Sequence, residues 1–490
     1  MVKDLKFNLA GKIVIAVCTL IAAAFCVFAC LNSLVPFRFK LIICIGLGVL
    51  YALFMLTQFA RPKALRIVIM ILAIILSLVL AVGTYYLIRV QNTLNSVTSD
   101  VVYKTDNMIV VAPSDSEMEN IDDAKEVVFG IQTAADIENT SKMIAHLENY
   151  YGTALKIKEY ENINELIDAL LKGEIDVIIY NDAFSNIIAD SFADYLSKVK
   201  VLHQYGIKIE VQLPQEEPPA EGNDKVPSGE FDITRDPFCV YISGIDVEGT
   251  ISKTSRSDVN IIMAVNPTTK KILLVTTPRD YYVPIPGVSG NMRDKLTHAG
   301  IYGVNASMNT LSQLYDINIK YYLRVNFTSL KTVVDALGGV DVYSEYAFMA
   351  NKSHFITKGM NHLNGEQALS FCRERKSFSD GDNQRGKNQQ AVLTAIIKKA
   401  MTPAILTRAN ELLNAVSGCM ETNMTPDEIG RLVDMQLSDM ASWEITSEAA
   451  TGISDMNTCY SLGSYEVYVM WPNETSVEAI MKKLHSVLAK

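Results

Sequence analysis

The sequence predicts an α/β protein that begins with transmembrane helices, and three observations carry this prediction. Three long apolar stretches follow one another within the first ninety residues. After them, apolar strand-like runs alternate with amphipathic helical patterns in two separate regions. With 490 residues, the chain is also too long for one ordinary domain. We expect a membrane anchor at residues 1–92, a small α/β domain at 100–212, a linker at 213–230 and a larger α/β domain at 231–490.

Charge and cysteine content exclude some classes of function. A formal net charge of -10 argues against nucleic acid as a partner, since no overall positive field would attract phosphates. The eight cysteines include no CxxC pair, so neither a zinc site nor a disulfide framework is indicated. A single bridge between Cys419 and Cys459 stays an open alternative.

The apolar stretches at residues 13–31, 41–59 and 67–88 each approach or exceed the roughly 20 residues that span a bilayer core. A signal peptide followed by core helices explains them less well, because no short apolar segment ends in a small-residue cleavage site. Basic residues precede the first stretch and lie between the second and third. The positive-inside rule then puts the N-terminus in the cytoplasm, and three spans place everything after about Arg89 outside.

The region from about residue 106 to 211 has a βαβαβ rhythm. Strand-like runs at residues 127–131, 155–160 and 176–182 alternate with helical patterns, the second of which is INELIDALLKG. The region contains no constellation of catalytic type. A scaffolding or partner-binding role is therefore favoured over a ligand site.

In the larger domain, charged residues stand where apolar strands end. We expect strands at residues 238–246, 259–265 and 271–277, and the third runs into Pro278–Arg279–Asp280. Ligands in α/β folds gather at strand termini, so this placement is typical of a site. Helices are expected at 304–315 and 328–336, and a strand at 465–471 is expected to complete the sheet.

An arginine-rich stretch at residues 363–390 predicts an anion site. If the chain is extended around Arg373 and Arg375, the two side chains share one face. A helix that begins near Gln384 would put Arg385 and Gln389, four residues apart, on one face as well. Three guanidiniums with an amide suit a diphosphate, because the planar fork of arginine pairs with phosphate oxygens. The alternative is a solvated charged turn, neutralised in part by neighbouring carboxylates.

Polar residues also interrupt the earlier strands, namely Asp246, Arg256, Asp258 and Arg279. A pair of carboxylates beside arginines is what a diphosphate with a divalent ion needs. The carboxylates would hold Mg²⁺ (or Mn²⁺), and the guanidiniums would bind the remaining phosphate oxygens. Structural salt bridges between these residues are the alternative.

Seven segments then occur in a fixed order: SGID, RSD, LLVTTPRDYYVPIPG, KLTHA, VVDALGGVDV, LNGEQALSFCRER and DNQRGKNQQ. Together they resemble the LytR–CpsA–Psr family of cell-envelope proteins, densely over residues 238–399. The anchor and the small α/β domain look like the family branch with an accessory domain. The resemblance implies a catalytic domain with a central mixed sheet flanked by helices.

The resemblance also implies a function at the bacterial cell membrane. It implies a polyprenyl (pyro)phosphate lipid in an apolar tunnel, with its head group at an arginine-rich mouth. An extracytoplasmic phosphotransferase would attach the lipid-linked anionic glycopolymer, such as capsular polysaccharide or teichoic acid, to peptidoglycan. Carried over by motif, Asp246 and Asp258 would hold Mg²⁺ and would belong to the catalytic set, together with Arg279, Arg373, Arg375 and Arg385. These four arginines would bind the head group, as would Arg256 and Gln389.

One departure and two alternatives accompany this resemblance. Many members have RQ where this chain has Asn388–Gln389, so one family arginine is absent. A non-catalytic polyprenyl-phosphate-binding regulator or scaffold is the first alternative, and a polyprenyl-diphosphate pyrophosphatase is the second. Transferase and pyrophosphatase differ in whether a sugar hydroxyl or water attacks. His298 is either a base or a structural group, and Tyr281 and Tyr282 are expected to pack.

Overall fold

The computed structural model describes residues 2–31, 37–59, 62–97, 102–192, 194–211, 231–245, 255–378, 381–402, 415 and 420–489. The expected linker at 213–230 and Asp246 lie outside these residues. The chain divides into two compact units, and the second holds the small α/β domain and most of the larger one.

The first unit contains three long apolar helices, α1 (Val2–Leu31), α2 (Phe37–Thr57) and α3 (Lys63–Val97), together with α15 (Pro426–Asp439). The segments Gly11–Leu31, Phe39–Thr57 and Lys63–Arg89 are long and apolar enough to cross a membrane, as expected. Tyr51 and Ser77 form a buried hydroxyl contact of 2.8 Å between α2 and α3, which satisfies polar groups that lie among apolar side chains.

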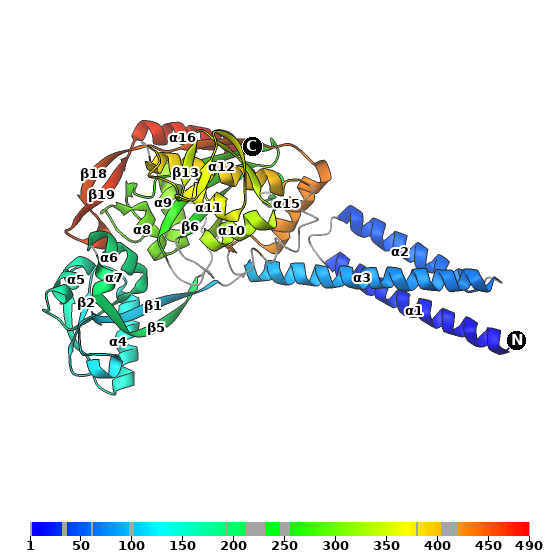
Figure 1. Ribbon diagram of the computed structural model, residues 1–490, viewed down its shortest axis with the longest axis horizontal. Coiled ribbons are helices and arrows are strands. Elements are labelled where there is room, and N and C mark those ends of the chain that lie inside the picture. Colours follow the sequence, from blue (N-terminus) through cyan, green and yellow to red (C-terminus); the bar gives the residue numbers. More distant parts are fainter. Residues whose placement is uncertain are drawn as a thin grey trace. The chain divides into compact units, whose positions relative to one another are not determined.

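The small domain is a five-stranded sheet with helices on opposite faces (Figure 1). Met143 and Leu147 of α4 pack in one core, and Ile163 and Leu166 of α5 pack in another. The strand order is β3-β2-β4-β1-β5, with β2 parallel to both β3 and β4. The elements of the predicted rhythm are β2 (Val128–Gln132), α4 (Ile137–Tyr151), β3 (Lys156–Tyr160), α5 (Ile163–Leu171) and β4 (Val177–Asn181), completed by β1 (Val102–Pro113) and β5 (Val199–Val211).

The larger domain contains a mixed six-stranded sheet in the order β16-β11-β6-β7-β8-β17. Strands β11 and β6 are parallel, as are β8 and β17, whereas β7 runs antiparallel to both of its neighbours. The carboxyl ends of β6, β8, β11 and β17 therefore lie at the same end of the sheet as the start of β7, and we call this end the sheet edge. The strands are β6 (Phe238–Ile245), β7 (Ser257–Asn266), β8 (Lys271–Thr276), β11 (Tyr321–Asn326), β16 (Met420–Thr422) and β17 (Glu444–Ala449).

Asparagine caps begin two helices beside this edge. Asn326 caps α10 (Phe327–Ala336), and Asn364 caps α11 (Gly365–Arg373), each through a reciprocal pair of side-chain bonds with the third helical residue. Because α11 continues to Arg373, the expectation of an extended chain around Arg373 and Arg375 is wrong. The other helices of this domain include α8 (Leu296–Ala299), α9 (Val304–Tyr315), α12 (Gly381–Ala400) and α16 (Glu474–Leu488).

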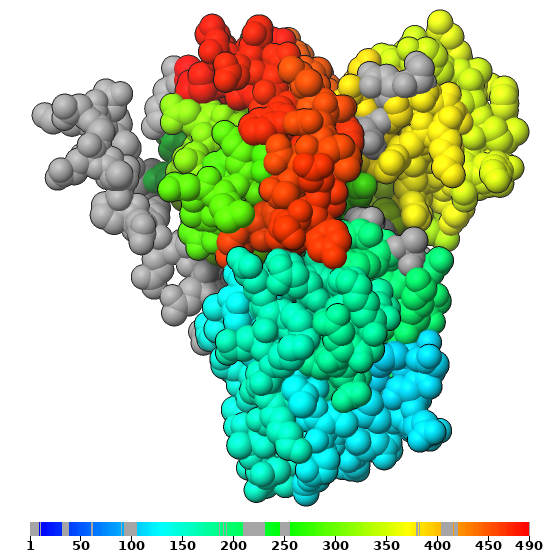
Figure 2. All heavy atoms as spheres, turned by 90° about the vertical axis from the view of Figure 1, so that its left-hand side faces the viewer, coloured from blue at the N-terminus to red at the C-terminus, as the bar shows by residue number. Residues whose placement is uncertain are grey.

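The strand expected at residues 465–471 exists as β19 (Glu466–Pro472), but it does not complete the main sheet. It pairs with β18 (Gly452–Thr458) in a separate hairpin, because β17 already occupies the free edge of β8. Figure 2 shows this hairpin, in orange and red, resting on the teal surface of the small domain. The two domains share one core, in which Ile163 and Leu166 of the small domain pack with Leu462 and Val469.

Candidate functional site

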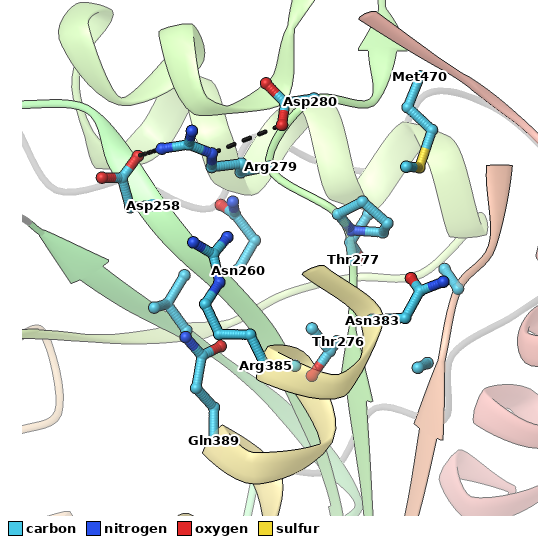
Figure 3. Close-up of a pocket in the computed structure, with 15 residues that line it drawn as sticks. Asp258, Asn260, Thr276, Thr277, Arg279, Asp280, Asn383, Arg385, Gln389 and Met470 are labelled. Carbon is cyan, nitrogen blue, oxygen red and sulfur yellow. Dashed lines mark hydrogen bonds and ion pairs between the residues drawn. The ribbon is translucent and has the colours of Figure 1, made fainter. Parts of the chain in front are cut away.

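A pocket lies at the sheet edge where the ends of β8 and β17 meet the start of β7. Figure 3 shows side chains from these strands and from α12 that point into the same space. The polar residues that line it include Asp258, Asn260, Thr276, Arg279, Asp280, Arg385 and Gln389. We call it the charged pocket.

A chain of opposite charges runs along one wall of the charged pocket. A guanidinium nitrogen of Arg279 donates to the carboxylate of Asp258 at 3.0 Å, and its Nε lies 3.5 Å from Asp280. The other carboxylate oxygen of Asp280 lies 3.5 Å from Nζ of Lys295. Each charge in this partly buried row thus has a neighbour of opposite sign, which offsets the cost of removing it from water.

Asp258 remains ionised although it is largely buried. Burial acts to raise its pKa, because loss of water disfavours the charged form. The charges of Arg279 and Arg256 act in the opposite direction, and so do hydrogen bonds from Arg279 and Thr297. Together they hold the pKa of Asp258 below its ordinary value. The carboxylate can therefore serve as an anionic ligand at neutral pH.

Buried hydroxyl groups fix the start of β7 beneath this carboxylate. The Tyr241 hydroxyl lies 2.7 Å from Ser257 Oγ and donates to Asn260 at 2.6 Å, and Ser257 Oγ also contacts Ser243 at 2.8 Å. The backbone on either side of Arg256 also packs closely against Gly300. A Cβ atom added to Gly300 would lie 2.7 Å from Ser255 O. The backbone that carries Arg256 and Asp258 is therefore held on two sides.

Helix α12 supplies the opposite wall of the charged pocket. Arg385 and Gln389 lie one helical turn apart and both face the pocket, as the spacing predicts (Figure 3). Asn388 donates to Phe371 O at 3.2 Å, and Gln390 donates to Leu274 O at 3.3 Å. These buried amides fasten α12 to α11 and to β8, and so help to fix the position of the helix that carries Arg385.

A second pocket, which we call the apolar pocket, adjoins the charged one. Asp258, Val259 and Gln389 line both pockets. Most of its other lining residues are aliphatic or aromatic side chains from β6, α10, α11 and α12, including Ile245, Phe327, Leu330, Leu369, Val392, Leu393 and Ile396. Arg373 also lines this pocket, and its guanidinium stacks 4.3 Å from the centre of the Phe327 ring.

The structure brings together some of the residues that the sequence singled out. Asp258, Arg279, Arg385 and Gln389 line the charged pocket, and Arg373 lines the apolar one. Arg256 lies near enough to Asp258 to lower its pKa. Arg375 is exposed and lines neither pocket, and Asp246 lies outside the described residues.

Two residues of the row of charges, Asp280 and Lys295, were not among the site residues predicted from the sequence. The signal that could have found them is their position in the segments PRD and KLTHA, which also contain the predicted Arg279 and the candidate base His298. His298 is 1 % exposed, and its Nδ1 lies 2.6 Å from Asp294. It is thus a structural group in this fold. Tyr281 and Tyr282 are buried, as expected.

The charged pocket fits a hard divalent ion in its chemistry. Asp258 provides a carboxylate that is ionised. Thr276, which also lines the pocket but lies beside α12 (Figure 3), has a buried Oγ1 without a hydrogen-bond partner among the described residues. Oxygen ligands of this kind are those that Mg²⁺ prefers. The other expected ligand, Asp246, follows directly after β6 in the sequence.

Comparison with known proteins places most of the chain in one family. The LytR_cpsA_psr family model matches residues 203–485. A second model, described as DNA polymerase processivity factor, matches residues 63–180, which join an apolar helix to part of the small domain and make up less than half of the chain.

The curated relatives are named polyisoprenyl-teichoic acid–peptidoglycan teichoic acid transferase TagU. The protein from Bacillus cereus is 37% identical over 202 residues, which cover 41% of this chain and 64% of that protein. The one from Enterococcus faecalis is 35% identical over 201 residues, with coverages of 40% and 65%. The chain therefore matches somewhat less than two thirds of the length of these relatives.

Solved structures with similarity to this chain include one titled TagT bound to LIIa-WTA, at 29% identity and a TM-score of 0.44. That match covers 54% of this chain and 95% of the other. Another is the crystal structure of B. subtilis TagU, at 30% identity and a TM-score of 0.41, with coverages of 52% and 98%.

We predict that Asp258 makes a pH-dependent contribution to stability. Because its pKa is lower in the folded chain than the ordinary 3.8, this contribution is complete above that value and is lost as the pH falls through the folded value. The free energy of unfolding of the wild type should therefore fall more steeply below about pH 4 than that of Asp258→Asn. Denaturant titrations at a series of acidic pH values measure both slopes. Parallel slopes would contradict the assignment.

Proposed function

Because the chain belongs to the LytR–CpsA–Psr family, whose model matches more than half of its length, we propose that it transfers a lipid-linked glycopolymer to peptidoglycan. The donor in this proposal is an anionic glycopolymer carried on a polyprenyl pyrophosphate. The names of the curated relatives support the reaction class, since they describe transfer of teichoic acid from a polyisoprenyl carrier to peptidoglycan.

The observation that carries the proposal is the junction of two unlike pockets. The apolar pocket suits a hydrocarbon chain, and the charged pocket suits the phosphates at the end of that chain. Asp258 and Gln389 line both, so one amphiphilic molecule could occupy the two pockets at once. A polyprenyl pyrophosphate has this combination of a long apolar tail and a compact anionic head.

The proposed reaction forms one phosphorus–oxygen bond and breaks another. A hydroxyl of peptidoglycan attacks the phosphorus that carries the glycan, the bond to the bridging oxygen breaks, and polyprenyl phosphate leaves with that oxygen. Because such transition states are loose, catalysis consists mainly of positioning and charge stabilisation, and the proton of the attacking hydroxyl passes to solvent water as the new bond forms. Arg279 and Arg385 are placed to donate to the phosphate oxygens that gain charge.

Mg²⁺ held by Asp258, and by Asp246 if it lies beside it, would neutralise phosphate oxygens of the bound head group. The arginines that face the pocket would bind the remaining oxygens through paired N–H donors. Arg373, at the border of the apolar pocket, would contact the phosphate nearest to the lipid chain. Arg256 stays near Asp258 and keeps that carboxylate ionised.

We also place the protein in the bacterial cell membrane. Three apolar helices of sufficient length support an anchor, and basic residues around the first and third stretches support a cytoplasmic N-terminus. With three spans, the α/β domains would lie outside. This location suits the chemistry, because lipid-linked polymer and peptidoglycan meet there.

We predict that Arg385→Lys lowers the transfer rate by about tenfold to a hundredfold. Lysine keeps the charge but loses the planar fork, so bidentate contact with phosphate is lost at a cost of roughly 1.5–3 kcal/mol. The measurement is transfer of a lipid-linked glycan to a peptidoglycan oligomer by the full chain with Mg²⁺. Lys387→Ala is the matched control, because Lys387 is exposed on the same helix and pairs at 3.7 Å with Glu345.

The products of this assay separate the proposal from its alternatives. Release of free glycan phosphate with no peptidoglycan adduct would indicate a pyrophosphatase. Binding of the lipid with no turnover would indicate a regulator or scaffold. Wild-type transfer by Arg385→Lys would show that the arginine contributes only charge.

Topology is tested by labelling in intact cells. We predict that a membrane-impermeant maleimide modifies Ser353→Cys, an exposed position of the larger domain, and does not modify Ala64→Cys, at the start of α3, until the membrane is permeabilised. The parent chain provides the background from native cysteines. The reverse pattern would place the α/β domains in the cytoplasm and contradict the proposed reaction site.

A further inference from the structure

The segment that carries the charged wall lies between two hydrophobic cores. Tyr281 packs in the core of the larger domain, whereas its neighbour Tyr282 packs in the core that the two domains share. Strand β9 (Tyr282–Val283) pairs with β10 (Asp294–Lys295), which brings Lys295 opposite Tyr282. The residues Asp280 and Lys295 thus stand next to side chains whose packing includes the small domain.

Asp294 fastens this segment to a loop of the larger domain. It is fully buried, and its Oδ1 accepts the backbone N–H of Lys295 at 2.8 Å and lies 2.6 Å from His298 Nδ1. Its Oδ2 accepts the backbone N–H of Ser461 at 2.9 Å. A buried carboxyl group with several hydrogen-bond partners is firmly held, because a buried oxygen that loses its partner is left unsatisfied at a cost in free energy.

The same loop is bound by the small domain on its other side. Asn164, which is fully buried on α5, donates to Leu462 O at 2.8 Å, and the Tyr460 hydroxyl donates to Ala134 O at 2.9 Å. Asn164 Oδ1 has no hydrogen-bond partner within the described part of the chain. The hydrogen bond to Leu462 O is therefore the contact through which the Asn164 side chain joins the two domains. Leu462 itself packs into the core beneath α5.

These contacts form a continuous path from the small domain to the charged pocket. The path runs from Asn164 through the backbone of Leu462 and Ser461 to Asp294, and on through Lys295 to Asp280 and Arg279. We propose that the small domain positions the charged wall through the Asn164–Leu462 contact, so that Asn164 is a positioning residue for head-group binding. This inference rests on the proposed function for the identity of the ligand, but the geometry of the path is independent of it.

The path has a physical consequence for binding. Lys295 contacts one oxygen of Asp280 while Arg279 approaches the other. A shift of the β9–β10 segment would therefore change the position of Asp280 and how strongly it competes with a ligand for Arg279. Couplings through such packed and hydrogen-bonded chains typically change affinity by a few-fold to about tenfold. An effect of this size is expected on binding of the head group.

The test compares two buried asparagines of the small domain in the full chain. Asn164→Leu keeps the volume and removes the contact with Leu462. Asn139→Leu is the matched control, because Asn139 donates only to Asp106 and Asp136 among the hydrogen bonds found, both within the small domain. Farnesyl diphosphate with Mg²⁺ is the binding probe, and hydrogen exchange across residues 279–298 reports on the positioned segment.

We expect Asn164→Leu to weaken probe binding about three- to tenfold and to speed exchange across residues 279–298, and Asn139→Leu to change neither. Tyr460→Phe, which removes the contact with Ala134, should act in the same direction and serves if Asn164→Leu does not fold. Unchanged binding and exchange in folded Asn164→Leu or Tyr460→Phe would overturn the inference.

The two proposals can fail separately. If the wild type does not bind the diphosphate probe, the head-group assignment fails, and the exchange measurement still decides whether the small domain positions the segment. If both asparagine variants speed exchange equally, the effect is general destabilisation and the specific path is wrong.

Discussion

A guanidinium held between two carboxylates is the interaction on which the site depends. Arg279 lies between Asp258 and Asp280 at the edge of a buried sheet, where unpaired charge would be costly. Its presence keeps Asp258 ionised despite burial, and Asp280 in turn anchors Lys295. Under the proposed function, Arg279 would exchange one of these carboxylate contacts for a contact with a phosphate oxygen.

The pairing of Arg279 with Asp258 and Asp280 also explains why the charged pocket and the apolar pocket can adjoin each other. The charges neutralise one another along the ends of β8 and the start of β7, so the neighbouring surface from β6, α10 and α12 can remain apolar. Gln389, a neutral amide, stands at the border and lines both pockets. A molecule with an anionic head and a hydrocarbon tail suits this boundary, which is the basis of the proposed lipid-linked donor.

Short-range patterns in the sequence predicted those features of the site that depend on helical spacing or on position at the end of a strand. The spacing of Arg385 and Gln389 placed them on one helical face, and the strand-end position of Arg279 placed it at the sheet edge. The condition of an extended chain around Arg373 and Arg375 is not met, because the helix that Asn364 caps at its start continues to Arg373. The role of Lys295 depends on pairing between β9 and β10, which no short-range pattern reveals.

Contacts between residues far apart in the sequence also determine which strand lies beside β8 and how the two domains are joined. β17 pairs with β8 across a large separation in sequence, which leaves β19 to form a hairpin with β18. The bond from Asn164 to Leu462 joins residues almost three hundred positions apart, and nothing in the pattern of α5 distinguishes that asparagine. The sequence favoured a scaffolding or partner-binding role for this region, and the contact on which the proposed positioning role rests comes from the fold.

The central claim is that one polyprenyl (pyro)phosphate fills both pockets. Native mass spectrometry of the full chain, purified from a bacterial membrane in mild detergent, tests it most directly. We expect an added mass that corresponds to such a lipid, its loss in Leu393→Trp, which fills the apolar pocket, and its retention in Ile453→Trp at an exposed position of β18. A wild-type chain without added mass, or equal retention in both variants, would contradict lipid binding in these pockets.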